Sequence, residues 1–227
     1  DVRDFCQRLQ EKYTHLDVLI NNAGALFNKR QETPEGLEKT FATDLLGPYL
    51  LTRLLLPLLK AAPAARIINV SSGGMYFGKL HLSDLQYRHR SYNGSMAYAE
   101  AKRGMMILTQ LWSKALENTS ITVNAMHPGW ADTPGVADAL PGFHQLTQLV
   151  LRDNTEGADT IVWLAVKPEL NTSGKFFFDR KPREVHRSHK TRSSLSEIES
   201  FWKYLGELTE GPEPFPYVAE PHPSKTL

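Results

Sequence analysis

A tyrosine and a lysine, Tyr98 and Lys102, stand four residues apart in a stretch whose apolar pattern predicts a helix over residues 95–116. The i,i+4 spacing places both side chains on one face of that helix. A free tyrosine has a pKa of about 10 and is a poor acid or base near neutral pH, but a neighbouring ammonium favours the phenolate. Such a pair can exchange a proton with a substrate oxygen. The spacing alone is weak evidence, because an exposed Tyr and a solvated Lys share it on many helices.

Three further segments of turn-forming or hydroxyl residues come directly after predicted strands. They are residues 21–24, 71–74 and 127–130, which follow strands at residues 17–20, 66–70 and 121–126. Because these strands alternate with long helices, the sequence predicts an α/β fold with a parallel sheet and helices on both faces. Ligands bind beyond the carboxyl ends of the strands in such sheets. We therefore expect the three segments to share one rim of the sheet, and the chemistry to lie there.

The rest of the sequence predicts further elements of this fold up to residue 178 and then changes in composition. Further helices and a last strand are predicted at residues 1–13, 37–59, 156–166 and 174–178. The second of these helices is expected to start at Thr33 and Pro34. Residues 180–193 carry six Lys or Arg against one Glu, which we interpret as a solvated basic segment. A capping pattern at residues 194–197 predicts a short amphipathic helix, and the five prolines of residues 211–227 are typical of an extended tail.

Composition excludes several classes of protein. A chain of 227 residues suits one α/β domain, and its net charge of +1 argues against a nucleic-acid partner. The single cysteine, Cys6, excludes an intrachain disulfide and a Cys-based zinc site, and we expect no metal site. The longest apolar run, residues 49–59, is interrupted by Arg53 and Pro57. We therefore expect no transmembrane segment. The single cysteine fits a reducing, cytoplasmic location, while a targeting signal upstream of Asp1 would leave an organelle or a membrane surface open as alternatives.

The order of these motifs resembles the short-chain dehydrogenase/reductase family. Asn-Asn-Ala-Gly after one strand, Ser-Ser after the next, Tyr-x-x-x-Lys on the following helix and Pro-Gly after the strand beyond it all stand at the family's element boundaries. The resemblance covers residues 1–179 and implies a Rossmann-type, doubly wound parallel sheet in three layers. The basic segment, short helix and tail of residues 180–227 would follow it.

The resemblance implies a role for each matching residue. Tyr98 would be the catalytic acid/base, Lys102 would bind the nicotinamide ribose and favour the ionised tyrosine, and Ser72 would hydrogen-bond the substrate oxygen. Ser71 is the less favoured alternative to Ser72. The residues matched to cofactor binding are Asn21, Ala23, Gly24, Tyr98, Lys102, Pro128, Gly129 and Thr133. The first three can also form a tight turn that stabilises the sheet, and the two roles are compatible.

Within the family, the long stretch between Ser72 and Tyr98 and the sequence of residues 84–86 resemble the retinol-dehydrogenase-like branch. The sequence of residues 126–136 resembles one group within the family whose substrate is unknown. The branch implies a small apolar carbonyl or alcohol substrate and NAD or NADP as cofactor, with NADP favoured. Related enzymes pair the helices expected here at residues 37–59 and 95–116. A homodimer or homotetramer is therefore expected through their apolar residues, which are Leu51, Leu54, Leu55, Leu58, Met105, Leu108, Leu111 and Trp112.

Two features depart from the family pattern. Asp44 stands where the family has Asn in an Asn-x-x-Gly setting. A backbone role in the proton relay survives this change, so Asp44 is kept among the catalytic residues. The family's Thr-Gly-x-x-x-Gly-x-Gly turn and its flanking strands are absent, so the sequence predicts an N-terminally truncated domain that binds NAD or NADP poorly.

Three functions are compatible with these residues. The leading one is an NAD(P)-dependent oxidoreductase that interconverts a carbonyl and an alcohol by hydride transfer. Asp44 and the absent turn favour a non-catalytic binding or scaffold protein, or an inactive truncated form. An epimerase or dehydratase of a related branch would require a longer substrate domain. His127 is interpreted as a packing residue at a strand end rather than as a base.

Overall fold

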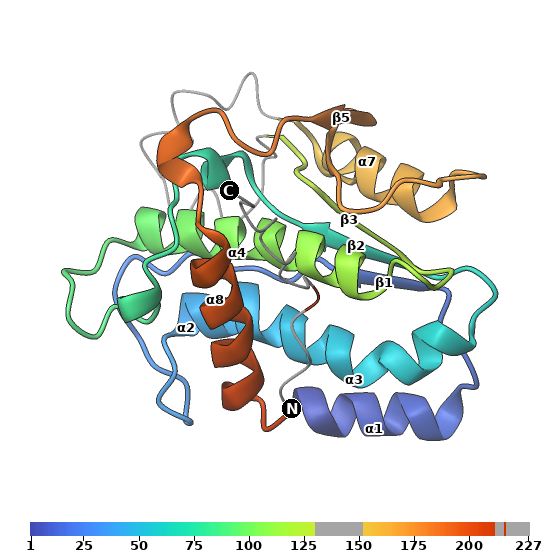
Figure 1. The fold of residues 1–227 in the computed structure, drawn as a ribbon, viewed down its shortest axis with the longest axis horizontal. Coiled ribbons are helices and arrows are strands. Elements are labelled where there is room, and N and C mark those ends of the chain that lie inside the picture. Colours follow the sequence, from blue (N-terminus) through green and yellow to red (C-terminus); the bar gives the residue numbers. More distant parts are fainter. Residues whose placement is uncertain (130–151, 212–215, 217–227) are drawn as a thin grey trace, which may run out of the picture.

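The sheet at the centre of the fold has five strands in the order β1-β2-β3-β4-β5. We describe residues 1–129, 152–211 and 216 of a computed structural model, shown in Figure 1. The strands are β1 (Val18–Asn21), β2 (Arg66–Val70), β3 (Thr122–Met126), β4 (Phe176–Phe178) and β5 (Lys181–Arg183). The first four run parallel, as the sequence predicted, and β5 pairs antiparallel with β4.

The strand β5 was not predicted. Asp179 and Arg180 connect it to β4 with φ angles of 52° and 58°, in the left-handed region that few non-glycine residues adopt, although Asp does so more often than most. The carboxylate of Asp159 pairs with the Arg180 guanidinium, and Thr160 Oγ1 accepts from Arg180 N at 3.2 Å. The turn is thus held by residues of α7 (Asn154–Val166) that are distant in the sequence, and no local sequence motif predicts it.

Helices cover the sheet on both sides (Figure 1). The helices α3 (Gly47–Ala61) and α4 (Gly94–Ala115) lie on one side, α7 (Asn154–Val166) lies on the other, and α1 (Val2–Lys12) packs against α3. Side chains of β2 alternate between the two sides, so Ile67 joins the core under α3 and α4 whereas Ile68 joins the cluster with Leu164 of α7. This is the predicted three-layer α/β arrangement.

The helix expected to start at Thr33 and Pro34 starts later. Residues 33–36 form a turn in which Gly36 N donates to Thr33 O at 2.9 Å, and Gly36 has a φ of +76° that a helix cannot continue. The helix α2 (Lys39–Phe41) begins after Glu38, whose carboxylate accepts from the backbone N–H groups of Thr40 and Phe41. The capping role of Glu38 therefore overrode the proline signal.

One long helix runs from Lys39 to Ala61, because the π-helical turn η1 (Ala42–Leu46) joins α2 to α3 without a break. By length and composition alone, this 23-residue helix is apolar enough to cross a membrane, which differs from the expectation drawn from residues 49–59. The difference arises because the π turn extends the helix upstream of residue 49. The core helix of a soluble protein meets the same criterion, and 56% of the most apolar window is buried here.

The segment after β2 is irregular, as expected, with two 3₁₀ turns, η2 (Gly73–Tyr76) and η3 (Leu82–Asp84). The Asp84 carboxylate accepts from three backbone N–H groups, those of residues 88, 89 and 90. Gln86 is buried, donating to Tyr204 Oη at 2.6 Å and accepting from Glu38 N at 3.2 Å. Asp84 and Gln86, which carried the resemblance to the retinol-dehydrogenase-like branch, thus hold the stretch between Ser72 and Tyr98 together and attach it to neighbouring helices.

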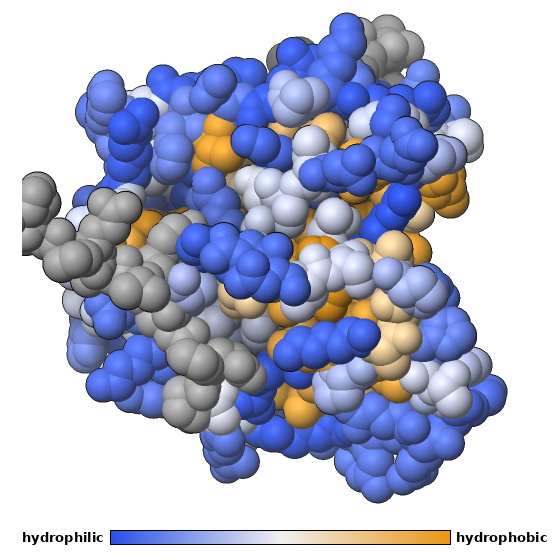
Figure 2. Space-filling view, turned by 45° about the vertical axis from the view of Figure 1, so that its right-hand side comes forward, coloured by the Kyte–Doolittle hydropathy of each residue, from blue (hydrophilic) through white to orange (hydrophobic). Residues whose placement is uncertain are grey.

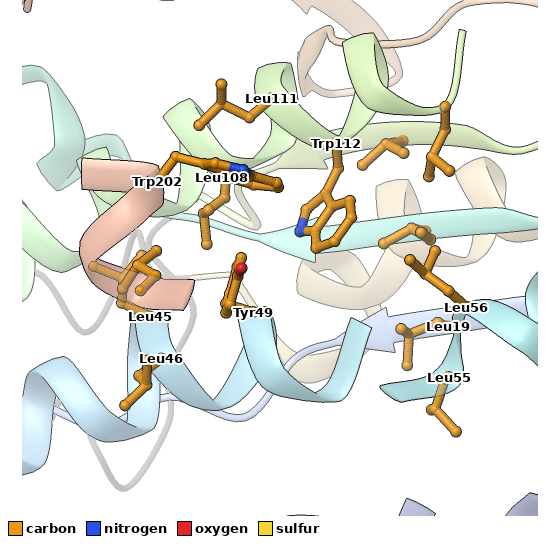
Figure 3. Packing of buried hydrophobic residues seen from close by; sticks show 14 of the residues in the cluster. Leu19, Leu45, Leu46, Tyr49, Leu55, Leu56, Leu108, Leu111, Trp112 and Trp202 are labelled. Carbon is orange, nitrogen blue, oxygen red and sulfur yellow. The ribbon is translucent and has the colours of Figure 1, made fainter. Parts of the chain in front are cut away.

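The helix α8 (Leu195–Leu208) belongs to the main core, although it lies in the segment after residue 179. Trp202 packs edge-on against Trp112 of α4 and Tyr49 of α3, with ring centroids 4.9 and 5.3 Å apart, as Figure 3 shows. Of the apolar residues expected at a subunit interface, Leu55, Leu58, Met105, Leu108, Leu111 and Trp112 are already buried within the single chain. An oligomer remains a prediction, but the apolar surface that motivated it is covered by the chain itself.

Apolar side chains are exposed around α7 and the edge strand β1. Figure 2 shows hydrophobic residues gathered around a hollow on a face that is otherwise mostly hydrophilic. On α7, Val162 and Val166 are 54% and 68% exposed, and Ile20 on the edge strand β1 is 40% exposed. Among the described residues, β1 pairs with β2 alone, so its other edge is unpaired. A groove of about 660 Å³ runs along α7, and none of the predicted site residues lines it.

Candidate functional site

Tyr98 and Lys102 lie on one face of α4, as their spacing predicted. Asn93 caps this helix by accepting from Met96 N at 3.0 Å, which places Tyr98 in the first turns. The Lys102 Nζ atom lies 5.3 Å from the centroid of the Tyr98 ring. Tyr98 is half-buried, whereas the Lys102 side chain is only 3% exposed. The buried ammonium therefore acts on a ring that still reaches the surface.

The Lys102 ammonium is held between two elements. It donates to the carbonyl of Val70, at the end of β2, at 3.2 Å. On its other side it forms an ion pair with Asp44 Oδ2 at 3.7 Å, and the Asp44 side chain is fully buried. The second oxygen of Asp44, Oδ1, accepts from Ala25 N at 2.7 Å. Asp44 thus links the loop after β1 to the lysine of α4.

The π-helical turn η1 places the Asp44 carboxylate. Such turns widen a helix locally and are frequent at functional sites. Burial raises the pKa of Asp44 from its ordinary value of 3.8 to about 6, even though the Lys102 ammonium and the Ala25 N–H both lower it. The carboxylate of Glu38 adds to the rise in pKa. Desolvation therefore outweighs the ion pair at this position.

Gly24 completes this cluster because it has no side chain. A Cβ atom on Gly24 would lie 2.8 Å from Lys102 Nζ and 3.2 Å from Asp44 Oδ1. Gly24 itself is exposed, so a ligand can approach the ammonium closely at this point. The loop after β1 and the Tyr–Lys helix thus meet at the rim, as the motif order predicted.

The two serines after β2 have different surroundings. Ser71 is buried, and its hydroxyl donates to the backbone carbonyl of Lys102 at 3.0 Å. Ser72 is half-buried, and its Oγ accepts from Gly74 N at 3.1 Å as the N-cap of η2. The hydroxyl hydrogen of Ser72 is therefore left for another acceptor, which supports Ser72 over Ser71 as the substrate-binding serine.

Asn21 points into the protein rather than towards a ligand. Its side chain is buried, and Nδ2 donates to Asn69 Oδ1 at 2.8 Å and to Thr52 Oγ1 at 3.2 Å. Asn69 in turn donates to Thr109 Oγ1 of α4 at 2.9 Å. This network joins neighbouring strands to both helices, so the structural reading holds for the Asn21 side chain. Ala23, two residues further on, is exposed at the rim.

Pro128 and Gly129 follow β3 at the same rim. Gly129 N donates to His127 Nδ1 at 3.1 Å, and His127 stacks on Phe178 with ring centroids 4.2 Å apart. Burial, with a contribution from the Arg152 guanidinium, lowers the pKa of His127 to about 4. A neutral, stacked imidazole fits the packing role expected for His127. Thr133, matched to the same cofactor segment, lies outside the described residues.

One group near this rim was missed from the sequence. The guanidinium of Arg152 forms two hydrogen bonds to the Asp179 carboxylate, at 2.6 and 3.0 Å, and a weaker one to Pro128 O at 3.3 Å. It also lies over the Phe178 ring, 4.7 Å from the centroid. Arg152 therefore fixes the segment after β3 to the end of β4, and its isolated position in the sequence gave no signal of this.

Comparison with known proteins decides the family. The short chain dehydrogenase family matches residues 1–141, which include every element of the rim up to Gly129. The chain belongs to the short-chain dehydrogenase/reductase family. Dehydrogenase/reductase SDR family member 12 from Bos taurus is 45% identical over 90% of this chain and 64% of that protein. Retinol dehydrogenase 14 from Mus musculus is 37% identical over 81% of this chain and 57% of that protein.

Solved structures agree with this family assignment at the level of the fold. An uncharacterized protein from Mycobacterium Paratuberculosis is 26% identical, with a TM-score of 0.72 over 95% of this chain and 74% of that chain. A protein from Escherichia coli CFT073 described as a short chain dehydrogenase complexed with NADPH is 22% identical, with a TM-score of 0.60 over 78% of this chain and 68% of that chain. The chain spans less than two thirds of the length of the curated relatives it matches.

The family assignment allows the residues of the rim to be compared with the family pattern. The structure brings the Tyr98–Lys102 pair together with Gly24, and the roles expected for Ser72, Tyr98 and Lys102 from the resemblance remain predictions. Asp44 departs from the pattern, and the structure shows the consequence, because its carboxylate is paired directly with Lys102. The chain is therefore a short-chain dehydrogenase/reductase in which a buried carboxylate is paired with Lys102 at the rim.

Proposed function

We propose that this chain carries the catalytic rim of an NAD(P)-dependent oxidoreductase that interconverts a carbonyl and an alcohol. The observation that carries the proposal is the placement of Lys102. Its ammonium is buried at the carboxyl end of the sheet, 3.2 Å from Val70 O, and faces the ring of the half-exposed Tyr98. A buried ammonium beside a tyrosine favours the ionised phenol, which is what a tyrosine needs to act as a base.

The residues of the rim divide the chemistry between them. Tyr98 transfers the proton to or from the substrate oxygen through its hydroxyl group. Ser72 donates a hydrogen bond to the same oxygen, and this polarises a carbonyl towards attack. Lys102 is held in place by Asp44 and Val70 and supplies the positive charge that stabilises the phenolate.

The rim fits the ribose of a nicotinamide cofactor at Gly24. A ligand approaching this exposed glycine meets a buried ammonium within van der Waals range, because no Cβ intervenes. A bound nicotinamide supplies or accepts the hydride. Pro128 and Gly129 would border its carboxamide, as the family pattern implies. The NADPH bound to the E. coli neighbour supports NADP as the preferred cofactor.

The substrate class follows from the relatives. Retinol dehydrogenases are among the proteins that this chain matches, which supports a small apolar alcohol or carbonyl compound as substrate. A cytoplasmic location and a homo-oligomer complete the proposal.

Replacing Tyr98 by Phe in the full-length protein tests the reaction, because the sequence predicts poor NADP(H) binding without the family's phosphate-binding turn. Turnover is expected to fall about 10²–10⁴-fold, the usual cost of losing a general acid or base. The dissociation constant of NADP(H), measured by fluorescence titration, is expected to change less than threefold, because only the phenol oxygen is lost. Tyr13→Phe is the matched control, since Tyr13 is exposed at the end of α1. Turnover of Tyr98→Phe within threefold of the wild type would overturn the assignment.

A non-catalytic binding protein is the second candidate, and Asp44 favours it. The Asp44 carboxylate offsets part of the positive charge that the proposed reaction needs at Lys102. Binding of NADP(H) without hydride transfer to any of a panel of aldehydes and ketones would favour this candidate. Transfer of label from NADP²H to one of them would exclude it.

A further inference from the structure

Asp44 is buried with few partners. Lys102 of α4 faces Oδ2, and Ala25 N of the loop after β1 donates to Oδ1. Glu38, the cap of α2, is the other charged group that acts on it. The Oδ2 atom accepts no hydrogen bond within the described residues and is held by the 3.7 Å ion pair alone. A buried carboxylate in this position is costly, and its principal counter-charge is the lysine of the proposed reaction.

We propose that Asp44 is a positioning residue that acts through Lys102. Its carboxylate holds the ammonium beside Gly24 and offsets part of the charge that Lys102 presents to Tyr98, so the site works at higher pH than it would with an amide at position 44. This inference rests on the proposed function, in which Tyr98 must lose and regain a proton. It concerns a side-chain charge, whereas the family pattern has an uncharged Asn at this position.

The geometry links Asp44 to Tyr98 through Lys102. Lys102 Nζ lies 3.7 Å from Asp44 Oδ2 and 5.3 Å from the centre of the Tyr98 ring. Charges interact strongly at these distances where water is excluded. An ammonium paired with a carboxylate has a much weaker field beyond the pair than an unpaired ammonium. The phenolate of Tyr98 is therefore stabilised less than it would be by Lys102 alone.

Protonation of Asp44 would remove the negative charge that offsets the charge of Lys102. Burial raises the pKa of Asp44 to about 6, so its carboxyl group is ionised above that pH and neutral below it. At low pH the wild-type site therefore has the same charge as a site with Asn at position 44. The difference between the two should grow as the pH rises through 6, whereas a purely structural effect of the substitution would not depend on pH.

The pH dependence of turnover in Asp44→Asn tests this. The pH at half-maximal alcohol oxidation is expected to fall by about one unit, which is a tenfold change in proton affinity. Wild type and variant are expected to coincide below about pH 6 and to separate above it, as the carboxyl group ionises. Asp17→Asn, which removes an exposed carboxylate, is the control and should leave the profile unchanged. A pH-independent difference between wild type and Asp44→Asn would overturn the proposal.

A second readout needs no turnover. In protein labelled with ¹³Cε-lysine, Lys102 is assigned with Lys102→Arg and its chemical shift is followed with pH. The wild-type shift should show an inflection near pH 6 from the ionisation of Asp44, and this inflection should be absent in Asp44→Asn, which has no carboxyl group beside Lys102. A wild-type Lys102 chemical shift without an inflection near pH 6 would sink the inference. The expected NMR changes in a protein that transfers no hydride would sink the proposed function instead.

Discussion

Gly24, Asp44 and Lys102 form a cluster in which each residue limits the others. Within the described residues, the ammonium is held by the Val70 carbonyl and the Asp44 carboxylate, and the space in front of it exists because Gly24 has no side chain. Buried charges are tolerated only when they are paired, so a shift of one member leaves another without compensation. The cluster should therefore respond to the addition of a single methyl group.

We expect Gly24→Ala to destabilise the protein by about 1 kcal/mol, the lower end of the usual cost of overpacking, because the group that must move is the end of a flexible side chain. The added Cβ would lie 2.8 Å from Lys102 Nζ, which is too close for both atoms to keep their places. Urea denaturation measures the change. Gly73→Ala is the matched control, since its Cβ would meet nothing nearer than His127 Cε1 at 3.7 Å. Equal stabilities of the two variants would contradict the expectation.

The sequence predicted part of this cluster. The facing of Tyr98 and Lys102 follows from helical geometry alone, and motif order placed Gly24 at the same rim. The pairing of Asp44 with Lys102 did not follow, because it joins distant residues through a π turn that no local propensity marks. The raised pKa of Asp44 was equally inaccessible, since it depends on burial by the rest of the fold.

Arg103 connects the elements around the rim to the basic segment. Its guanidinium is fully buried and donates to Met75 O at 2.8 and 3.1 Å and to Val185 O at 3.0 Å. Desolvation lowers the pKa of Arg103 to about 10. Tyr76 adds a hydrogen bond to Glu184 O at 2.6 Å. The chain after β5 is therefore fastened to η2 by backbone carbonyls, although its own side chains are mostly exposed charges.

We expect Arg103→Met to lower the free energy of unfolding by about 1–3 kcal/mol, because two buried carbonyls lose their donors while a desolvated charge is removed. The segment of residues 181–192 should also become more sensitive to trypsin, which cleaves after its Lys and Arg residues. Limited proteolysis followed by mass spectrometry would locate the first cuts. Arg8→Met, on the exposed face of α1, should change neither quantity. First cuts outside residues 181–192 would show that Arg103 does not anchor them.

Strong periodic patterns predicted most elements, and special turns account for the failures. The strands β1, β2 and β3 lie where short apolar runs followed by turn residues placed them, and the helix α4 lies where helical spacing placed it. The start of α2 was wrong because Gly36 and the cap Glu38 outweighed Pro34. The strand β5 was missed because its turn depends on contacts with α7. Tertiary contacts, not local sequence, decided both cases.

At the scale of the whole molecule, α8 determines how much of the surface of α3 and α4 is available to a second subunit. Trp202, Leu205 and Phe201 are buried against α3 and α4 in the main core. Arg53 of α3 donates to the carbonyls of Thr209 and Gly211 just beyond the helix, with the first bond at 2.7 Å. A homo-oligomer formed through α3 and α4 would have to displace this helix. The proposed oligomer therefore needs another surface as long as α8 stays in place.

We expect Trp202→Ala to unfold more easily than the wild type by about 3–5 kcal/mol, the usual cost of truncating a buried aromatic side chain. Trp202 contacts both Trp112 and Tyr49, so its loss opens the face that α8 covers. The apolar residues of that face would then be available to a second copy, and self-association should increase with protein concentration. Multi-angle light scattering at several concentrations and guanidinium denaturation measure the two effects. Leu195→Ala is the matched control on the same helix, because Leu195 is 51% exposed and its truncation should leave both stability and mass unchanged. A Trp202→Ala protein with wild-type mass at every concentration would show that covering α3 and α4 is not what keeps that face from pairing.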